Sequence, residues 1–205
     1  VMMSIVSRLG TAIIATYGIG IRIIDLIQAF TFGLMRATSI MIGQNVGNEM
    51  YARAEKIAYR NILLTFAILS VGAVFLLIFR EPIFQTFIND PMVVSEGSVF
   101  MSIFVPSIPF FGIFFVGGAV AYGSGHPLAY MVVGIIRLWI LRVLLAYTLT
   151  FVLGLGSVGV WIAMTISNVG AGILTILWVM QGSWKRRVIE IHAKSNHDKL
   201  SSSTN

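Results

Sequence analysis

Three charged side chains lie within one long apolar stretch, and their spacing would place them on the same face of a helix. Residues 12–42 are mostly Ile, Leu, Phe and Met, but they include Arg22, Asp25 and Arg36. Because each residue of an α-helix advances by about 100°, these three fall on one stripe of the helix surface. The other members of the stripe are small, namely Gly18, Ala29, Gly33 and Gly43. An apolar helix of this kind is typical of a helix in lipid that turns the stripe toward a partner or a water-filled cavity.

The carboxylate of Asp25 has two interpretations. In the first it is a coupling site that binds Na⁺ or a proton, or that pairs with a cationic substrate, because an isolated charge in a bilayer costs roughly 3 kcal/mol or more. In the second it is structural, because Arg22 lies one turn back and could neutralise it permanently. The spacing favours the structural pair. Arg36 either lines the same cavity or extends its charge to the membrane surface.

A second pair of charges, Arg137 and Arg142, lies near the middle of the apolar stretch 128–152. Each is about ten residues from the nearer end, a depth on the order of 15 Å. Residues five apart on an α-helix point about 140° away from each other. We therefore expect one arginine to face a water-filled path and the other to face a partner inside the bundle. The amides of Gln44, Asn45 and Asn168 are expected to form hydrogen bonds between helices.

The composition is that of an integral membrane protein. Hydrophobic residues make up 57% of the 205 residues, charged residues 11%, and the mean hydropathy is +0.90, whereas soluble domains have about 25% charged residues. The net charge of +6 is spread over loops, tail and helix interiors, so we expect the lipid bilayer and not nucleic acid as a partner. The sequence has no cysteine, which excludes disulfides and thiol-ligated metals. It has no recognisable catalytic triad, phosphate-binding glycine loop or metal cluster, so we predict neither an enzyme nor a cofactor.

The apolar stretches predict an all-α polytopic membrane protein with five full spans and a partial first helix. The partial helix is 1–9, and the spans are about 12–42, 57–79, 93–122, 128–152 and 158–180. The stretch 43–60 is predicted as a polar loop, and Pro106 and Pro109 predict a kink in the third span. These elements form one transmembrane lobe, 1–182, followed by a basic tail, 183–205, that is expected to be partly disordered. The basic loop and the basic tail are expected on the same, cytoplasmic side.

Two sequence patterns resemble those of the MATE (multidrug and toxic compound extrusion) transporters. The first is a G-Q-N-x-G pattern followed by R-A, which stands here at Gly43, Gln44, Asn45, Gly47, Arg53 and Ala54. The second belongs to the last helix pair and stands here at Arg142, Leu145, Ala146, Tyr147, Gly156, Gly159, Val160 and Trp161. Val143 and Leu144 depart from the family, which often has a proline here, and this departure removes an expected kink. The resemblance covers almost the whole chain.

The resemblance implies one of two six-helix lobes, here the C-terminal lobe without most of its first helix. It further implies a plasma-membrane antiporter that exports small organic cations in exchange for Na⁺ or H⁺. The partner would be a missing N-terminal lobe or a second half-transporter, and because the chain starts at Val1 we expect it to be part of something larger. One branch of the family binds the coupling cation in the first lobe, and another uses acids on the first and fourth helices of the second lobe. The fourth helix, here that of Pro106 and Pro109, is expected to carry no acid.

Two alternatives stay open within this resemblance. One is a lipid-linked oligosaccharide flippase of the same superfamily, because such proteins line their cavities with more cationic residues, and Arg36, Arg137 and Arg142 fit that pattern. The other is a truncated half-transporter that is inactive alone, because alternating access requires two bundles that move around a central site.

Overall fold

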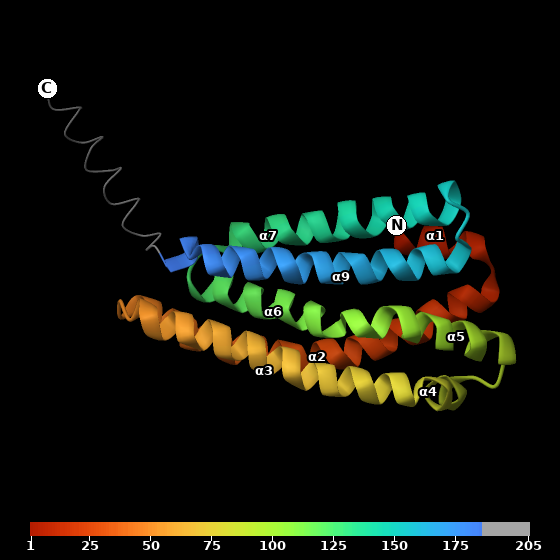
Figure 1. Cartoon of the computed structure of the whole chain (residues 1–205), viewed down its shortest axis with the longest axis horizontal. Coiled ribbons are helices and arrows are strands. Elements are labelled where there is room, and N and C mark those ends of the chain that lie inside the picture. The colour runs from red at the N-terminus through yellow and green to blue at the C-terminus, as the bar shows by residue number, and fades with distance from the viewer. Residues whose placement is uncertain (186–205) are drawn as a thin grey trace, which may run out of the picture.

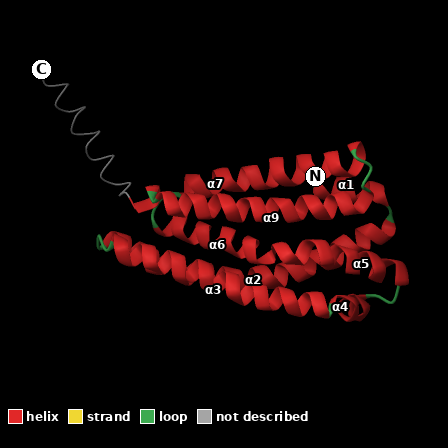
Figure 2. Ribbon diagram, in the orientation of Figure 1, coloured by secondary structure: helices red, strands yellow, loops and turns green. Residues whose placement is uncertain are grey.

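The computed structural model describes residues 1–185, and every element in this part is a helix (Figure 2). The α-helices are α1 (Met2–Val6), α2 (Thr11–Gly47), α3 (Tyr51–Ile78), α4 (Arg80–Phe87), α5 (Pro91–Phe104), α6 (Ile108–Gly123), α7 (Pro127–Ile135), α8 (Leu145–Tyr147) and α9 (Gly156–Gln181). The 3-10 helices are η1 (Ser7–Leu9), η2 (Val105–Ser107) and η5 (Ser183–Lys185), and the π-helices are η3 (Ile136–Leu144) and η4 (Thr148–Val152). The predicted tail, 183–205, begins with η5, and the rest of it, 186–205, lies outside the described residues.

The long helices lie side by side along the longest axis of the molecule and form one bundle (Figure 1). Its middle is the span Pro91–Gly123, in which α5, η2 and α6 follow one another and α6 packs against α2, α3 and α9. In the most apolar 18 residues of this span 72% are buried. In the corresponding stretch of the span Pro127–Val152 only 6% are buried. Glycines permit this close packing, since a Cβ added to Gly172 of α9 would lie 2.9 Å from the backbone oxygen of Phe110. Small residues allow helix backbones to come close together in lipid, where burial of apolar surface does not drive helices together.

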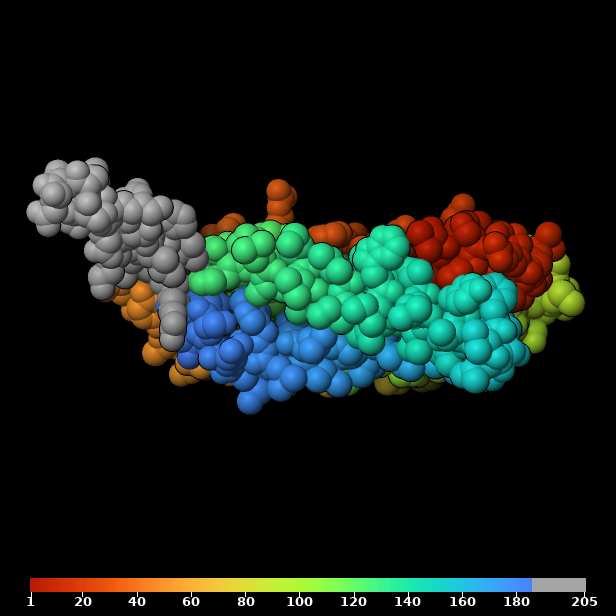
Figure 3. Space-filling view, turned by 90° about the horizontal axis from the view of Figure 1, so that it is seen from above, coloured from red at the N-terminus to blue at the C-terminus, as the bar shows by residue number. Residues whose placement is uncertain are grey.

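Most of the outer surface of the bundle is apolar, as a lipid-facing surface must be. Five helices of the described part are long and apolar enough to cross a membrane. Large side chains such as Leu26, Leu63, Val71 and Leu128 are about 70% exposed on them, at 72%, 69%, 73% and 70%. One such face, seen in Figure 3, is formed by the segment from α7 to η4 beside α9, with the N-terminal residues at one end. The expectation of an all-α polytopic membrane fold is confirmed.

The central span changes its helical form at the predicted proline site. α5 ends at Phe104, η2 follows with Pro106 inside it, and α6 begins at Ile108. Proline has no backbone N–H, so carbonyl groups near it lose their partners within the helix. Two hydroxyl groups make up for this loss, because Thr165 Oγ1 on α9 donates to the carbonyl of Ile103 at 2.8 Å and Ser107 Oγ donates to the carbonyl of Phe104 at 2.7 Å.

The stretch 43–60, predicted as a polar loop, is almost entirely helical. α2 continues to Gly47 and α3 begins at Tyr51, which leaves only 48–50 between them. Glu49 stands there with a φ of 61° and turns the chain. The prediction was wrong because it took charged residues as the end of a helix. Beyond the apolar part of a span, charged side chains on a helix simply reach water.

Candidate functional site

Arg137 and Arg142 meet at one point, although α-helical spacing predicts that they diverge. Both donate to Oδ1 of Asn168 on α9, Arg137 from Nη2 at 3.2 Å and Arg142 from Nη2 at 2.8 Å. The reason is that both lie in the π-helix η3. A π-helix closes its hydrogen bonds between residues i and i+5, so residues five apart are about one turn apart and share a face. The prediction that the two arginines have different surroundings is therefore wrong.

Asn168 also connects these arginines to the break in the central span. Its Nδ2 donates to Oγ of Ser107 in η2 at 3.0 Å. Arg142 makes a further hydrogen bond from Nε to Oγ of Ser167 at 2.9 Å. The interhelical hydrogen bonds expected of Asn168 are confirmed. We call the five residues that join η3, α9 and η2 in this way the arginine cluster: Ser107, Arg137, Arg142, Ser167 and Asn168.

Arg137 is enclosed by aromatic rings. Its Cζ lies 4.6 Å from the ring centroid of Phe111 and 5.0 Å from that of Phe114, both on α6. Only 8% of the residue is exposed, and its Nε is buried with no hydrogen-bond partner. The faces of aromatic rings attract a cation, so the rings hold the guanidinium plane in place without satisfying its N–H groups.

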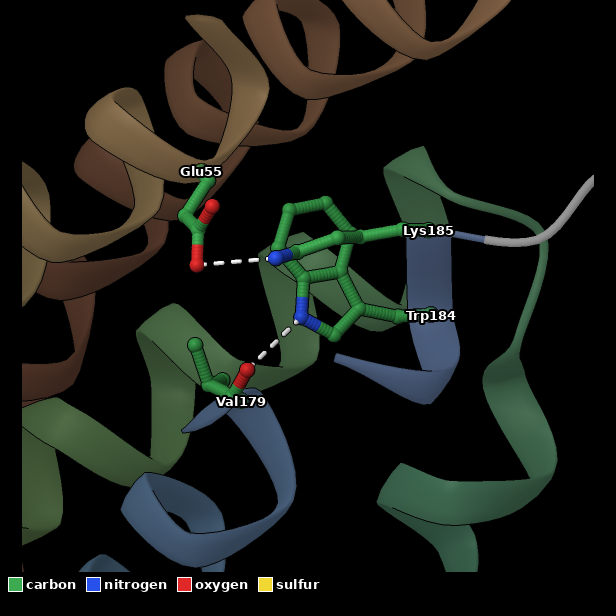
Figure 4. Close-up of polar contacts among 4 residues, drawn as sticks. All are labelled: Glu55, Val179, Trp184 and Lys185. Atoms are coloured by element: carbon green, nitrogen blue, oxygen red, sulfur yellow. Dashed lines mark hydrogen bonds and ion pairs between the residues drawn. The ribbon is translucent and has the colours of Figure 1, made fainter. Parts of the chain in front are cut away.

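The described residues place no carboxylate against these two cations. The single ion pair among residues 1–185 joins Lys185 Nζ to Glu55 Oε1 at 2.8 Å, where η5 meets α3 at one end of the bundle (Figure 4). There Trp184 donates from Nε1 to the carbonyl of Val179 at 3.0 Å, which anchors η5 on α9. This pair is remote in sequence and structure from the arginine cluster, which therefore carries two positive charges inside the lobe.

Glu96 is a second acid inside a span, and the sequence interpretation missed it. It lies on α5, which continues into the helix of Pro106 and Pro109, so the expectation that this helix carries no acid is wrong. Oε1 of Glu96 accepts a hydrogen bond from Nε1 of the fully buried Trp161 at 2.9 Å. The ring of Trp161 in turn stacks with Tyr17 at a centroid distance of 6.3 Å. Glu96 is thus a half-buried carboxylate next to an aromatic group.

The charged stripe of α2 lies on the surface of the lobe. Arg22, Asp25 and Arg36 are all exposed, and in the described part Arg22 and Asp25 form no ion pair within 4.0 Å. The structural pairing that the sequence favoured is therefore not made. Arg36 lines an open pocket of about 540 Å³ together with Phe32, Met35, Ser39 and Tyr122.

The G-Q-N-x-G residues stand at the end of α2, where it crosses α6. A Cβ added to Gly43 would lie 3.3 Å from the backbone oxygen of Gly123, so this glycine lets the two helices touch. Asn45 donates to the carbonyl of Met41 in its own helix at 2.7 Å, and its Oδ1 is buried without a partner. The interhelical bond expected of Asn45 is therefore absent from the described structure. Three further residues of the pattern are exposed here: Gln44, Gly47 and Arg53.

Comparison with known proteins identifies related sequences along most of the chain. The MatE family model matches residues 1–148. The "Probable multidrug resistance protein NorM" of Thermotoga maritima is 22% identical over 180 residues, which are 88% of this chain and 39% of that protein. The "Probable multidrug resistance protein YpnP" of Bacillus subtilis is 26% identical over 184 residues, 90% of this chain and 41% of that protein.

Solved structures show the same arrangement of helices. The structure described as "MATE transporter ClbM in complex with Rb+" superposes with a TM-score of 0.83 at 20% sequence identity and covers 90% of this chain and 44% of that one. The chain thus spans about two fifths of the length of the relatives that it matches. This proportion corresponds to one lobe of such a protein.

Proposed function

Because this chain belongs to the MatE family, we propose that it works as one lobe of a multidrug efflux transporter that exports small organic cations in exchange for Na⁺ or H⁺. A transporter role and a location in a membrane follow from the family and from the five apolar spans. The coupling ion, the substrate and the plasma membrane as location are parts of the proposal.

The observation that carries the proposal is the exposed charged stripe of α2. Arg22, Asp25 and Arg36 lie on the outside of the lobe, along a helix of 37 residues that is long enough to cross the membrane. A charge facing hydrocarbon at the membrane centre costs about 3 kcal/mol by insertion scales. The stripe therefore requires a second lobe, or a water-filled cavity between two lobes, to cover it.

Within that cavity Asp25 is our candidate for the coupling carboxylate. It is exposed on the stripe and makes no ion pair with Arg22, so it is free to bind Na⁺, a proton or a cationic substrate. The arginine cluster is unsuited to this role, because two guanidinium groups repel a cation. The coupling cation would then bind at Asp25, at Glu96 of α5 or in the partner lobe.

Drug efflux in a host without its own pumps tests the proposal. Cells would express this chain alone, or this chain with an N-terminal lobe of about six helices restored, and accumulation of a fluorescent organic cation would be followed. We expect only the completed protein to lower accumulation, and Asp25→Asn to abolish this effect. Asp90→Asn is the matched control, because Asp90 caps the start of α5 outside the spans and asparagine caps equally well.

Three results would count against the proposal. Export by the chain alone would show that a second lobe is not needed, or that two copies replace it. Full export by Asp25→Asn would remove Asp25 from the mechanism. Failure of the completed protein to export any cation, with normal insertion in the membrane, would favour the flippase alternative.

A further inference from the structure

The arginine cluster has far more hydrogen-bond donors than acceptors. A guanidinium group carries five N–H donors, so Arg137 and Arg142 together offer about ten. The described residues accept only three hydrogen bonds from them, two at Asn168 Oδ1 and one at Ser167 Oγ. One donor, the Nε of Arg137, is buried and has no hydrogen-bond partner among the described residues. Buried donors without partners are rare in folded proteins because each costs free energy.

The cluster also has an unbalanced charge. Both Nη2 atoms lie within hydrogen-bond distance of one oxygen, at 3.2 and 2.8 Å, so these two nitrogens are at most about 6 Å apart, where like charges repel appreciably. Within residues 1–185 neither arginine has a carboxylate oxygen within 4.0 Å. Charged groups buried in a membrane protein are normally paired with one another or with an opposite charge.

The acids of the spans, Glu96 and Asp25, lie farther than 4.0 Å from both arginines. Glu96 accepts from Trp161, and Asp25 is exposed on the outer stripe of α2. The neutral side chains that bind the arginines also have other hydrogen bonds. Asn168 Nδ2 donates to Ser107, and Ser167 Oγ donates to the carbonyl of Met164 at 2.8 Å. No described side chain near the cluster can therefore supply the missing negative charge.

We propose that the arginine cluster binds a small inorganic anion of the size and charge of chloride. The anion accepts from the free N–H groups of Arg137 and Arg142 and balances their charge. Two features prepare the site. The π-helix η3 turns both arginines to one face, and the rings of Phe111 and Phe114 lie against the guanidinium group of Arg137 without accepting its N–H groups. Hydrogen bonds between a guanidinium group and an anion are among the stronger ones. The site goes beyond the proposed export function, and its test needs no transport.

Thermal unfolding of the purified 205-residue chain in detergent tests the proposal. Sodium gluconate, whose anion is much larger than chloride, is replaced stepwise by sodium chloride at constant ionic strength, and the midpoint of unfolding is followed by tryptophan fluorescence. A ligand that binds only the folded protein raises its stability in a saturable way. We expect the midpoint to rise by several degrees and to reach a plateau, and Arg137→Gln to lose this response.

Asn168→Asp decides the question even if Arg137→Gln fails to fold. This substitution places a fixed carboxylate between the two guanidinium groups and leaves the shape of the side chain almost unchanged. We expect the midpoint of the variant to be insensitive to chloride, although the variant also loses the hydrogen bond from Nδ2 of Asn168 to Ser107. Arg36→Gln removes an exposed arginine and should keep the full chloride response. A parent midpoint that does not depend on the anion, or an unchanged chloride response in Asn168→Asp, would overturn the proposal.

Discussion

Gly123 is the last residue of α6, and its replacement by alanine tests whether the contact between the backbones of α2 and α6 stabilises the lobe. A Cβ at this position would stand 2.5 Å from the carbonyl oxygen of Ser39 and 3.0 Å from Cβ of Ile42. Carbon–oxygen contacts lie at about 3.3–3.6 Å, so the two helices would have to separate by about 1 Å. Overpacking of this kind costs about 1–3 kcal/mol. The better helix propensity of alanine recovers at most about 1 kcal/mol.

We therefore expect Gly123→Ala to lower the free energy of unfolding by about 1–2 kcal/mol. For a chain of this length that corresponds to a decrease of about 2–8 °C in the unfolding midpoint, measured by tryptophan fluorescence in detergent. Gly72→Ala is the matched control, because a Cβ on Gly72 in α3 would meet nothing within 4 Å. Its midpoint should stay the same or rise. If both variants have the same midpoint, the close contact at Gly123 contributes nothing and the reasoning is refuted.

Two further predictions concern polar contacts of the bundle. Trp161→Phe removes the indole N–H from Glu96, and because hydrogen bonds to charged groups contribute about 1.5–3 kcal/mol, the unfolding midpoint should fall by more than in the half-buried control Trp178→Phe. A midpoint equal to that of the control would show that the 2.9 Å contact is not stabilising. For Lys185 and Glu55, whose side chains are 31% and 35% exposed, a double-mutant cycle with Lys185→Gln and Glu55→Gln should give a coupling of about 0.2–1 kcal/mol. That coupling should decrease in high salt; one that is insensitive to salt would contradict an electrostatic origin.

The spans could be predicted from the sequence because lipid imposes a simple rule on composition and length. Each apolar stretch between turn-forming residues became a long helix, and Pro106 lies where the third span changes its helical form. Helix ends were harder, because polar residues at 43–60 continue the helices into water. The start of the third span did have a usable signal. Asp90 followed by Pro91 is a typical N-cap and first residue, and Asp90 Oδ1 accepts from the backbone N of Met92 at 2.8 Å. The predicted span of about 93–122 already contained Glu96, so this acid was missed although the helix was predicted.

The meeting of Arg137 and Arg142 could not be predicted, because the sequence argument assumed an α-helix. No propensity distinguishes a π-helical residue from an α-helical one, since the choice depends on packing against the neighbouring helices. The acceptor was visible, because Asn168 was recognised as a polar amide within a span. The pairing of Asn168 with both arginines could not be predicted, because it depends on the helix being a π-helix and not only on the five-residue spacing. The exposure of Asp25 was likewise a matter of tertiary packing, and the local one-turn relation to Arg22 gave the wrong partner.

The π-helical run has a consequence for how this span can change in evolution. η3 contains nine residues and η4 five, within a span of 26, whereas π-helix normally occurs as a single wide turn. Because each wide turn holds more residues than an α-helical turn, the span carries residues that an α-helix of the same topology would not need. In an alignment with relatives whose corresponding helix is α-helical throughout, we expect a gap inside this span and not in a loop. Gain or loss of one residue there would rotate Arg142 away from Asn168, so an insertion or deletion, without any substitution, can move a charge from one face of a membrane helix to another.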